Sequence, residues 1–174
     1  MVKIEIIKGD ITERGTDAII HTANNILILG SGLGGAIKAK GGSSIIQECI
    51  KKSPVNVGDA VLTKGGNLKA RHVIHAAVME YDGPIEGANI GASLLNSLKL
   101  ANKHHLKSLS IPDMSIGIVR FSPEECAKII FSTLKRFLDE ENSTLELVEI
   151  VLWDIETLRI YKQIYSTIYE QEGS

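Results

Sequence analysis

The stretch from Asp17 to Ile37 constrains the fold of this chain more than any other. An apolar segment, DAIIHT, leads into the polar turn Ala23–Asn25 and then into the glycine-rich run GSGLGGAI. This order predicts a strand, a turn and a glycine loop that opens a helix at about Gly35. Glycines leave the backbone N–H groups of such a loop open to a ligand, and the helix adds the positive end of its dipole. The stretch therefore predicts a site for a phosphate-bearing ligand.

Short segments rich in valine and isoleucine alternate with amphipathic segments along the chain. Helical periodicity covers Ser43–Lys52 and Asn89–His105. A third helix is predicted to begin at Ser122, which has a capping-box pattern, and to run to about Glu140. Such alternation is typical of an α/β protein with a largely parallel sheet covered on both faces, which binds ligands at the carboxyl ends of its strands. The predicted strands are Val2–Ile7, Asp17–Thr22, Ala60–Thr63, His72–Val78, Ser108–Ile111 and Leu147–Trp153.

Composition narrows the class of protein further. The 174 residues suffice for a hydrophobic core, and we expect one domain over residues 1–174. A net charge of −2 argues against bulk nucleic-acid binding, so a phosphate partner should be small. Cys49 and Cys126 fall in predicted helices without metal-ligand spacing, which favours buried, reduced thiols in a cytoplasmic protein. No apolar run approaches the ~20 residues that cross a bilayer, so we expect no membrane partner; the oligomeric state stays open.

Gly30, Gly32 and Gly35 also fit the GxGxxG pattern of dinucleotide-binding proteins. That fingerprint belongs on the first strand and is followed roughly 20 residues later by an acidic residue at the end of the next strand. The nearest acid here, Glu48, lies in a helical pattern. A nicotinamide-dependent oxidoreductase is therefore disfavoured.

Side chains at three predicted strand ends have two interpretations each. Asp10 either accepts a hydrogen bond from an exocyclic amine such as that of adenine, or caps the next turn through the backbone of Thr12. Asn24 either binds ribose hydroxyls or supports the turn. Trp153 either packs in the core or stacks on a base. The five histidines are predicted to be neither ligands nor catalysts, although His21 adjoins the glycine loop.

The order and spacing of these segments resemble those of the macro domain family over nearly the whole chain. The resemblance implies a three-layer α/β/α fold around a mostly parallel mixed sheet. It also implies binding of ADP-ribose, either free or on an ADP-ribosylated protein; some members remove ADP-ribose from proteins or deacetylate O-acetyl-ADP-ribose. The matching pieces are GDIT (Gly9–Thr12), DAIIHTANN (Asp17–Asn25), the glycine loop with its helix (Gly30–Ile37), GDAVLTKGGNL with HVIHAAV (Gly58–Val78) and SLSIPDMSIG (Ser108–Gly117).

Carried over position by position, the resemblance implies where the ligand binds. Asp10 and the Ile11 backbone would contact adenine, and Trp153 would stack on it. Asn24 would contact the distal ribose, and two loops would bind the diphosphate. No cofactor and no metal are implied. The residues assigned to the ligand are Asp10, Ile11, Ala23, Asn24, Gly30, Ser31, Gly32, Leu33, Gly34, Ser115, Ile116, Gly117, Ile118, Val119 and Trp153.

The chain departs from the family where hydrolytic members carry out their chemistry. Many of them have an aspartate within GGGVDGAI that orients the attacking water, and Gly34 holds that position here. No carboxylate occurs between Ala18 and Gln47, so the first loop supplies no general base of that kind. The family's NAAN reads HTAN here, beginning at His21. We therefore assign no catalytic residue and expect binding; an ADP-ribosyl or O-acetyl-ADP-ribose hydrolase is the alternative, and a relative without its ligand also stays open. For Asp113 and His21, a part in such hydrolysis stays open beside a role in local structure.

Overall fold

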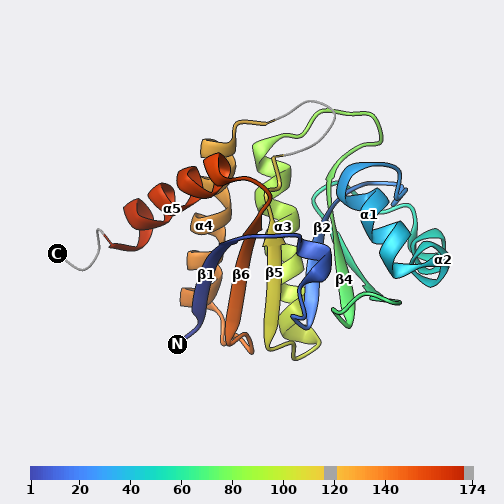
Figure 1. The fold of residues 1–174 in the computed structure, drawn as a ribbon, viewed down its shortest axis with the longest axis horizontal. Helices are drawn as coiled ribbons and strands as arrows, with labels where there is room; N and C mark the ends of the chain where they lie inside the picture. Colours follow the sequence, from blue (N-terminus) through green and yellow to red (C-terminus); the bar gives the residue numbers. More distant parts are fainter. Residues whose placement is uncertain (116–120, 171–174) are drawn as a thin grey trace.

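The computed structural model describes residues 1–115 and 121–170. Within these residues, helices cover a six-stranded sheet on both faces (Figure 1), so the predicted three-layer α/β/α fold is confirmed. The elements are β1 (Lys3–Lys8), the 3₁₀ turn η1 (Ile11–Glu13), β2 (Ala18–Asn24), α1 (Gly32–Gly41), α2 (Ser43–Lys52), β3 (Ala60–Lys64), β4 (His72–Met79), α3 (Gly87–Lys103), β5 (Ser108–Pro112), α4 (Pro123–Glu140), β6 (Leu147–Leu152) and α5 (Ile155–Glu170).

The strand order is β1-β6-β5-β2-β4-β3. Every neighbouring pair is parallel except β3 and β4, which are antiparallel. The largely parallel sheet expected from the sequence is therefore confirmed. Because five strands point the same way, their carboxyl ends meet along one edge of the sheet, where loops after widely separated strands come together.

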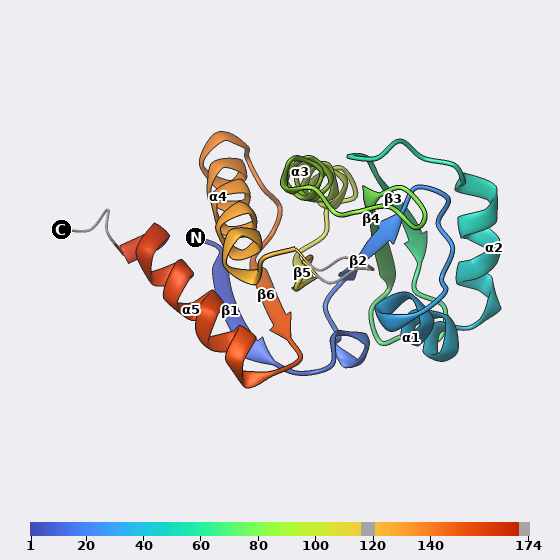
Figure 2. The ribbon, with the colours of Figure 1, turned by 90° about the horizontal axis from the view of Figure 1, so that it is seen from above.

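Two apolar layers lie on the two faces of the sheet. Ile20 and Ile74 point into the layer under α3, α4 and α5, whereas their neighbours Ile19 and Val73 point into the layer under α1 and α2. Figure 2 shows α3 and α4 on one side of the sheet and α1 on the other. Successive strand residues point to opposite faces, so a strand that is buried on both faces is mostly apolar along its whole length.

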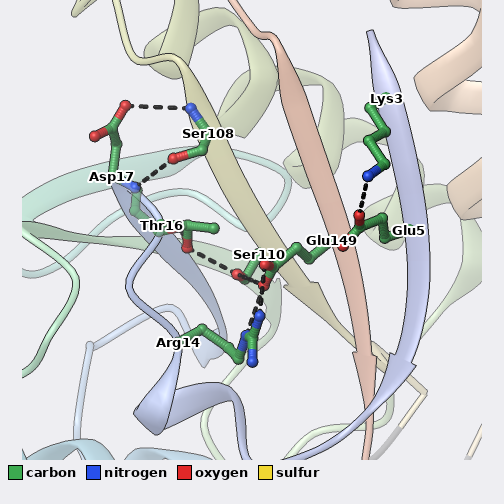
Figure 3. Close-up of polar contacts among 9 residues, drawn as sticks. Lys3, Glu5, Arg14, Thr16, Asp17, Ser108, Ser110 and Glu149 are labelled. Atoms are coloured by element: carbon green, nitrogen blue, oxygen red, sulfur yellow. Dashed lines mark hydrogen bonds and ion pairs between the residues drawn. The ribbon is translucent and has the colours of Figure 1, made fainter.

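An ion pair between a half-exposed arginine and a buried glutamate fixes the segment that follows η1 (Figure 3). The Nε and Nη2 atoms of Arg14 each donate to the Glu149 carboxylate at 2.8 Å. Ser110 Oγ donates to the same carboxylate at 3.1 Å, and Thr16 Oγ1 lies 2.7 Å from Ser110 Oγ. The hydrogen bond from Arg14 holds the pKa of Glu149 below its usual value, so the carboxylate stays ionised. These contacts anchor the chain around η1 to β5 and β6.

The structure extends the sequence prediction at two helices. The helix after the glycine loop begins at Gly32 rather than near Gly35. Helix α5 was not predicted, although Asp154 accepts a hydrogen bond from Thr157 N at 2.8 Å, and Leu158 and Tyr161 bury one face of the helix. The sequence signal for α5 is an aspartate just before the helix, followed by apolar residues at helical spacing. Among the described residues, no helix is long and apolar enough to span a membrane.

Candidate ligand-binding site

A cleft of about 720 Å³ opens at the edge of the sheet where the parallel strands end. Its lining comes from residues at or just after the ends of β1, β2, β4, β5 and β6, and from the first residues of α1. A cleft of this size suits a small-molecule ligand, because such sites usually measure roughly 300–1,000 Å³. Its position is the one expected for ligands of an α/β sheet covered on both faces.

Most of the residues assigned to the ligand line this one cleft. The other described ones, Ala23 and Ser115, are buried and do not belong to its lining. The predicted second loop, Ile116, Gly117, Ile118 and Val119, lies outside the described residues. The fold thus brings the first glycine loop, the segment after β1 and the residue after β6 together. The lining residues among those predicted are Asp10, Ile11, Asn24, Gly30, Ser31, Gly32, Leu33, Gly34 and Trp153.

The glycine loop presents free backbone donors to the cleft. Ser31 is the N-cap of α1, and its carbonyl accepts the first helical hydrogen bond, from Gly35 N, at 3.1 Å. The N–H groups of Gly32, Leu33 and Gly34 come before that bond and have no acceptor within the helix. Gly32 has φ +54°, a left-handed conformation that favours glycine. These donors and the helix dipole favour an anion at this end of the cleft.

Asp10 serves the turn and also lines the cleft. Its Oδ1 accepts hydrogen bonds from Thr12 N at 3.0 Å and Thr12 Oγ1 at 2.6 Å, and its Oδ2 accepts one from Lys40 Nζ at 2.8 Å. Partial burial alone would raise the pKa of Asp10, but the hydrogen bonds from Lys40 and Thr12 outweigh it and lower the pKa. The carboxylate is therefore ionised at neutral pH and remains an acceptor for an amine.

Asn24 likewise holds its own turn while it lines the cleft. Its Nδ2 donates to the carbonyl of Ile28 at 3.0 Å, and its Oδ1 accepts from Ile26 N and Ile28 N, both at 3.2 Å. These bonds close the loop between β2 and α1, and the capping role is the one the structure shows directly.

Trp153 is not a core residue. Its side chain is 72% exposed where the chain leaves β6, at the cleft. Tyr81 and Ile28, at 52% and 46% exposure, also line the cleft. Exposed large apolar side chains that gather at one opening favour a flat apolar ligand group such as a base.

Two histidines, of which the sequence leaves only His21 open as a participant in hydrolysis, lie at and beneath the cleft. His21 lines the cleft, and its Nδ1 lies 3.0 Å from Nδ1 of His75, its register partner on β4. Burial lowers the pKa of His21 to about 4 and that of His75 well below its usual value, so both rings are neutral at neutral pH. In the sequence, each histidine stands out only as a polar residue in an apolar strand; that the two rings touch follows from the pairing of β2 with β4.

Asp113, for which the sequence leaves open either a part in hydrolysis or a structural role, also lines the cleft. Its Oδ1 accepts hydrogen bonds from Ser115 N and Oγ and from the Tyr161 hydroxyl, at 3.0, 2.6 and 2.8 Å. These bonds hold the chain as it leaves β5, which is a structural role. Within the described part of the chain, no group of three or more histidine, cysteine, aspartate or glutamate side chains could hold a metal ion.

The fold and the cleft define a three-layer α/β/α protein with a glycine-rich loop, suited to binding an anion, at the carboxyl ends of its strands. The Macro domain family model matches residues 20–130. An O-acetyl-ADP-ribose deacetylase 1 from Pantoea vagans is 38% identical over 170 residues, which cover 94% of this chain and 99% of that protein. A macro domain-containing protein from Caldanaerobacter subterraneus is 35% identical, covering 95% of this chain and 97% of that one. The chain belongs to the macro domain family.

Solved structures agree with this assignment. A macrodomain from Oceanobacillus iheyensis with ADP superposes with a TM-score of 0.86 at 28% identity, over 97% of this chain and 92% of that one. A Trypanosoma brucei macrodomain in complex with ADP-ribose gives a TM-score of 0.84 at 26% identity, over 92% of this chain and 68% of that one.

Proposed function

We propose that this protein binds ADP-ribose, free or attached to a protein, in the cleft at the strand ends. The observation that carries the proposal is the combination, in one cleft of about 720 Å³, of free helix N-terminal amides at Gly32–Gly34 with the ionised carboxylate of Asp10. The amides suit a diphosphate, and the carboxylate suits the exocyclic amine of adenine. Relatives whose structures hold ADP or ADP-ribose support this pairing of ligand and cleft.

The exposed indole of Trp153, which lines the same cleft as Asp10, gives the adenine a stacking surface in this pose. The distal ribose then extends toward the end of β2, where His21 and Asn24 line the cleft. We also propose a cytoplasmic location, supported by Cys49 and Cys126, which are both free and buried.

Isothermal calorimetry with ADP-ribose tests the proposal, with NAD and AMP as comparison ligands in the same buffer. We expect micromolar binding of ADP-ribose and much weaker binding of the other two. Asp10→Ala should weaken binding by about 1–3 kcal/mol, the cost of losing a charge-assisted hydrogen bond, which is roughly 5- to 150-fold in affinity.

Glu13→Ala is the matched control. Glu13 also pairs with Lys40, at 3.1 Å, but it does not belong to the lining of the cleft. Its removal should leave the affinity within about twofold of the wild-type value, since a surface ion pair contributes at most ~1 kcal/mol to stability and does not touch the ligand. Equal affinities for wild type and Asp10→Ala would disprove the pose, and no heat with any ligand would disprove the ligand assignment.

A further inference from the structure

A row of buried polar side chains runs under the glycine loop across three strands. His21 on β2 lies 3.0 Å from His75 on β4, measured between their Nδ1 atoms. The Nε2 atom of His75 lies 2.9 Å from Thr63 Oγ1 on β3. All three side chains are buried, and only His21 belongs to the lining of the cleft. The row therefore ends in the cleft at one imidazole.

The contacts of the row are all satisfied when His75 Nε2 and His21 Nδ1 carry the protons. The Thr63 hydroxyl then donates to the carbonyl of Lys64, at 3.1 Å, while its oxygen accepts from His75 Nε2; Cys49 Sγ lies 3.7 Å from the same nitrogen. A neutral imidazole has one N–H, so in this arrangement His75 Nδ1 is an acceptor. Its partner, His21 Nδ1, is then the donor. His21 Nε2 is left with a lone pair and no proton.

That lone pair faces the loop position where hydrolytic relatives carry their aspartate. A Cβ atom built on Gly34 would lie 3.1 Å from His21 Nε2 and 3.5 Å from its Cε1. The imidazole edge therefore lies against the point from which an aspartate side chain at residue 34 would start. The chain lacks that carboxylate, but in this tautomer it has an unprotonated nitrogen beside the same place.

We propose that His21 Nε2 is the catalytic base of this cleft and that it acts on acyl esters of the distal ribose of ADP-ribose. The proposal rests on the proposed function, because the ester must first bind as ADP-ribose does. His75 and Thr63 are positioning residues, since they reach the substrate only through His21. Their role is to keep His21 in the tautomer whose free lone pair faces the cleft.

The hydrolytic step balances with water and the ester alone. The oxygen of a water molecule held by His21 Nε2 attacks the acyl carbonyl carbon while Nε2 takes one of its protons. The bond between the acyl carbon and the ribose oxygen breaks, and the ribose oxygen takes the proton from His21. The products are a carboxylic acid and ADP-ribose, and the imidazole returns to its neutral form. Burial supports this role, because the lowered pKa of His21, about 4, keeps the ring neutral at neutral pH, and in the tautomer described above its Nε2 is then unprotonated.

The test measures release of ADP-ribose from O-acetyl-ADP-ribose together with ADP-ribose affinity. His21→Asn keeps an amide that can donate to His75 Nδ1 but removes the imidazole lone pair. We expect kcat to fall at least 100-fold, within the range that a general base contributes. The dissociation constant for ADP-ribose should stay within threefold, which a collapse of the site would not allow.

A double variant, His21→Asn with Gly34→Asp, supplies the missing carboxylate in the space the imidazole vacates. It should regain at least tenfold in kcat over His21→Asn. Gly34→Asp alone should not raise activity, because its Cβ would lie 3.1 Å from the imidazole. Thr63→Val, outside the cleft, removes the nearer of the two polar partners of His75 Nε2 and should lower kcat at least fivefold at unchanged KM.

The outcomes separate the two proposals. A wild-type protein that binds ADP-ribose but releases none from the ester above a buffer blank overturns the role of His21 and leaves the binding function standing. Wild-type kcat in His21→Asn, or in Thr63→Val if the first variant does not fold, overturns it as well. Failure of the wild type to bind ADP-ribose overturns the proposed function itself.

Discussion

The two buried histidines predict an unusual loss of stability in mild acid. The folded-state pKa of His21 is about 4, and that of His75 is also well below 6.5, because burial disfavours the charged ring. In the unfolded chain both rings titrate near their ordinary value of about 6.5. Between these two values the unfolded state binds protons that the folded state does not. The free energy of unfolding must therefore fall as the pH drops below about 6.5.

The size of this effect follows from the pKa difference. Each histidine contributes a slope approaching ~1.4 kcal/mol per pH unit once its unfolded form is fully protonated. For His21 alone, whose folded pKa is about 4, the loss between pH 6.5 and that pKa is about 3 kcal/mol. His75 adds to the slope over the same range. Together they remove a large share of the ~5–15 kcal/mol that stabilises an ordinary domain.

Urea unfolding followed by circular dichroism at several pH values between 7.5 and 5 measures the slope. This window lies above the range where Asp17 and Glu149 act, because their lowered pKa values make their contribution disappear only below their usual values near 4. Near pH 5 the slope of the free energy of unfolding against pH should approach that for uptake of two protons on unfolding in the wild type, and of one proton in His21→Asn. A flat profile, or an unchanged slope in the variant, refutes the neutral buried pair.

Three further outcomes follow from the packing. Gly65→Ala should lower the free energy of unfolding measured in urea by about 2 kcal/mol, because its Cβ would collide with the carbonyl oxygen of Ala70. Gly15→Ala is the control: a Cβ there meets nothing within 4 Å and should change stability by less than ~0.5 kcal/mol. Equal effects of the two variants would contradict the contact. Glu149→Leu should lower the free energy of unfolding in urea by about 2 kcal/mol. The loss is smaller than for most buried ion pairs because the side chain of the partner, Arg14, is 38% exposed and can reach water. An unchanged free energy of unfolding would contradict an ion pair that anchors η1. Burial raises the pKa values of the two thiols to about 11 and about 12, so a disulfide reagent should label neither in the native protein and both in urea.

The parts of the site that the sequence could predict are those with a local signal. The glycine loop can be recognised from its composition, and Asp10 comes directly after a segment in which apolar and polar residues alternate as in a strand. For Asp10 and Asn24, the structural interpretation and the binding interpretation were not exclusive, because each side chain caps a turn and lines the cleft at once. A short polar residue at a strand end is suited to both tasks, and local sequence cannot separate them.

The contact between His21 and His75 had no such signal. The two residues are far apart in the chain, and they meet because β2 pairs with β4 in parallel at that register. Sequence periodicity shows which face of a strand is apolar, but it does not show which strand lies beside it. Whether two polar residues in separate strands are solitary or paired is therefore decided only by the topology.

This contact also changes how the departures from the family pattern should be interpreted. Taken singly, glycine at residue 34 and histidine at residue 21 look like two independent losses. In the structure the two positions are coupled, because a Cβ on Gly34 would lie 3.1 Å from His21 Nε2. An aspartate there crowds the imidazole, while a smaller asparagine at residue 21 leaves it room. We therefore expect relatives with histidine at residue 21 to have glycine at residue 34, and relatives with aspartate at 34 to have a smaller residue at 21. Frequent pairing of aspartate with histidine in an alignment would contradict this coupling.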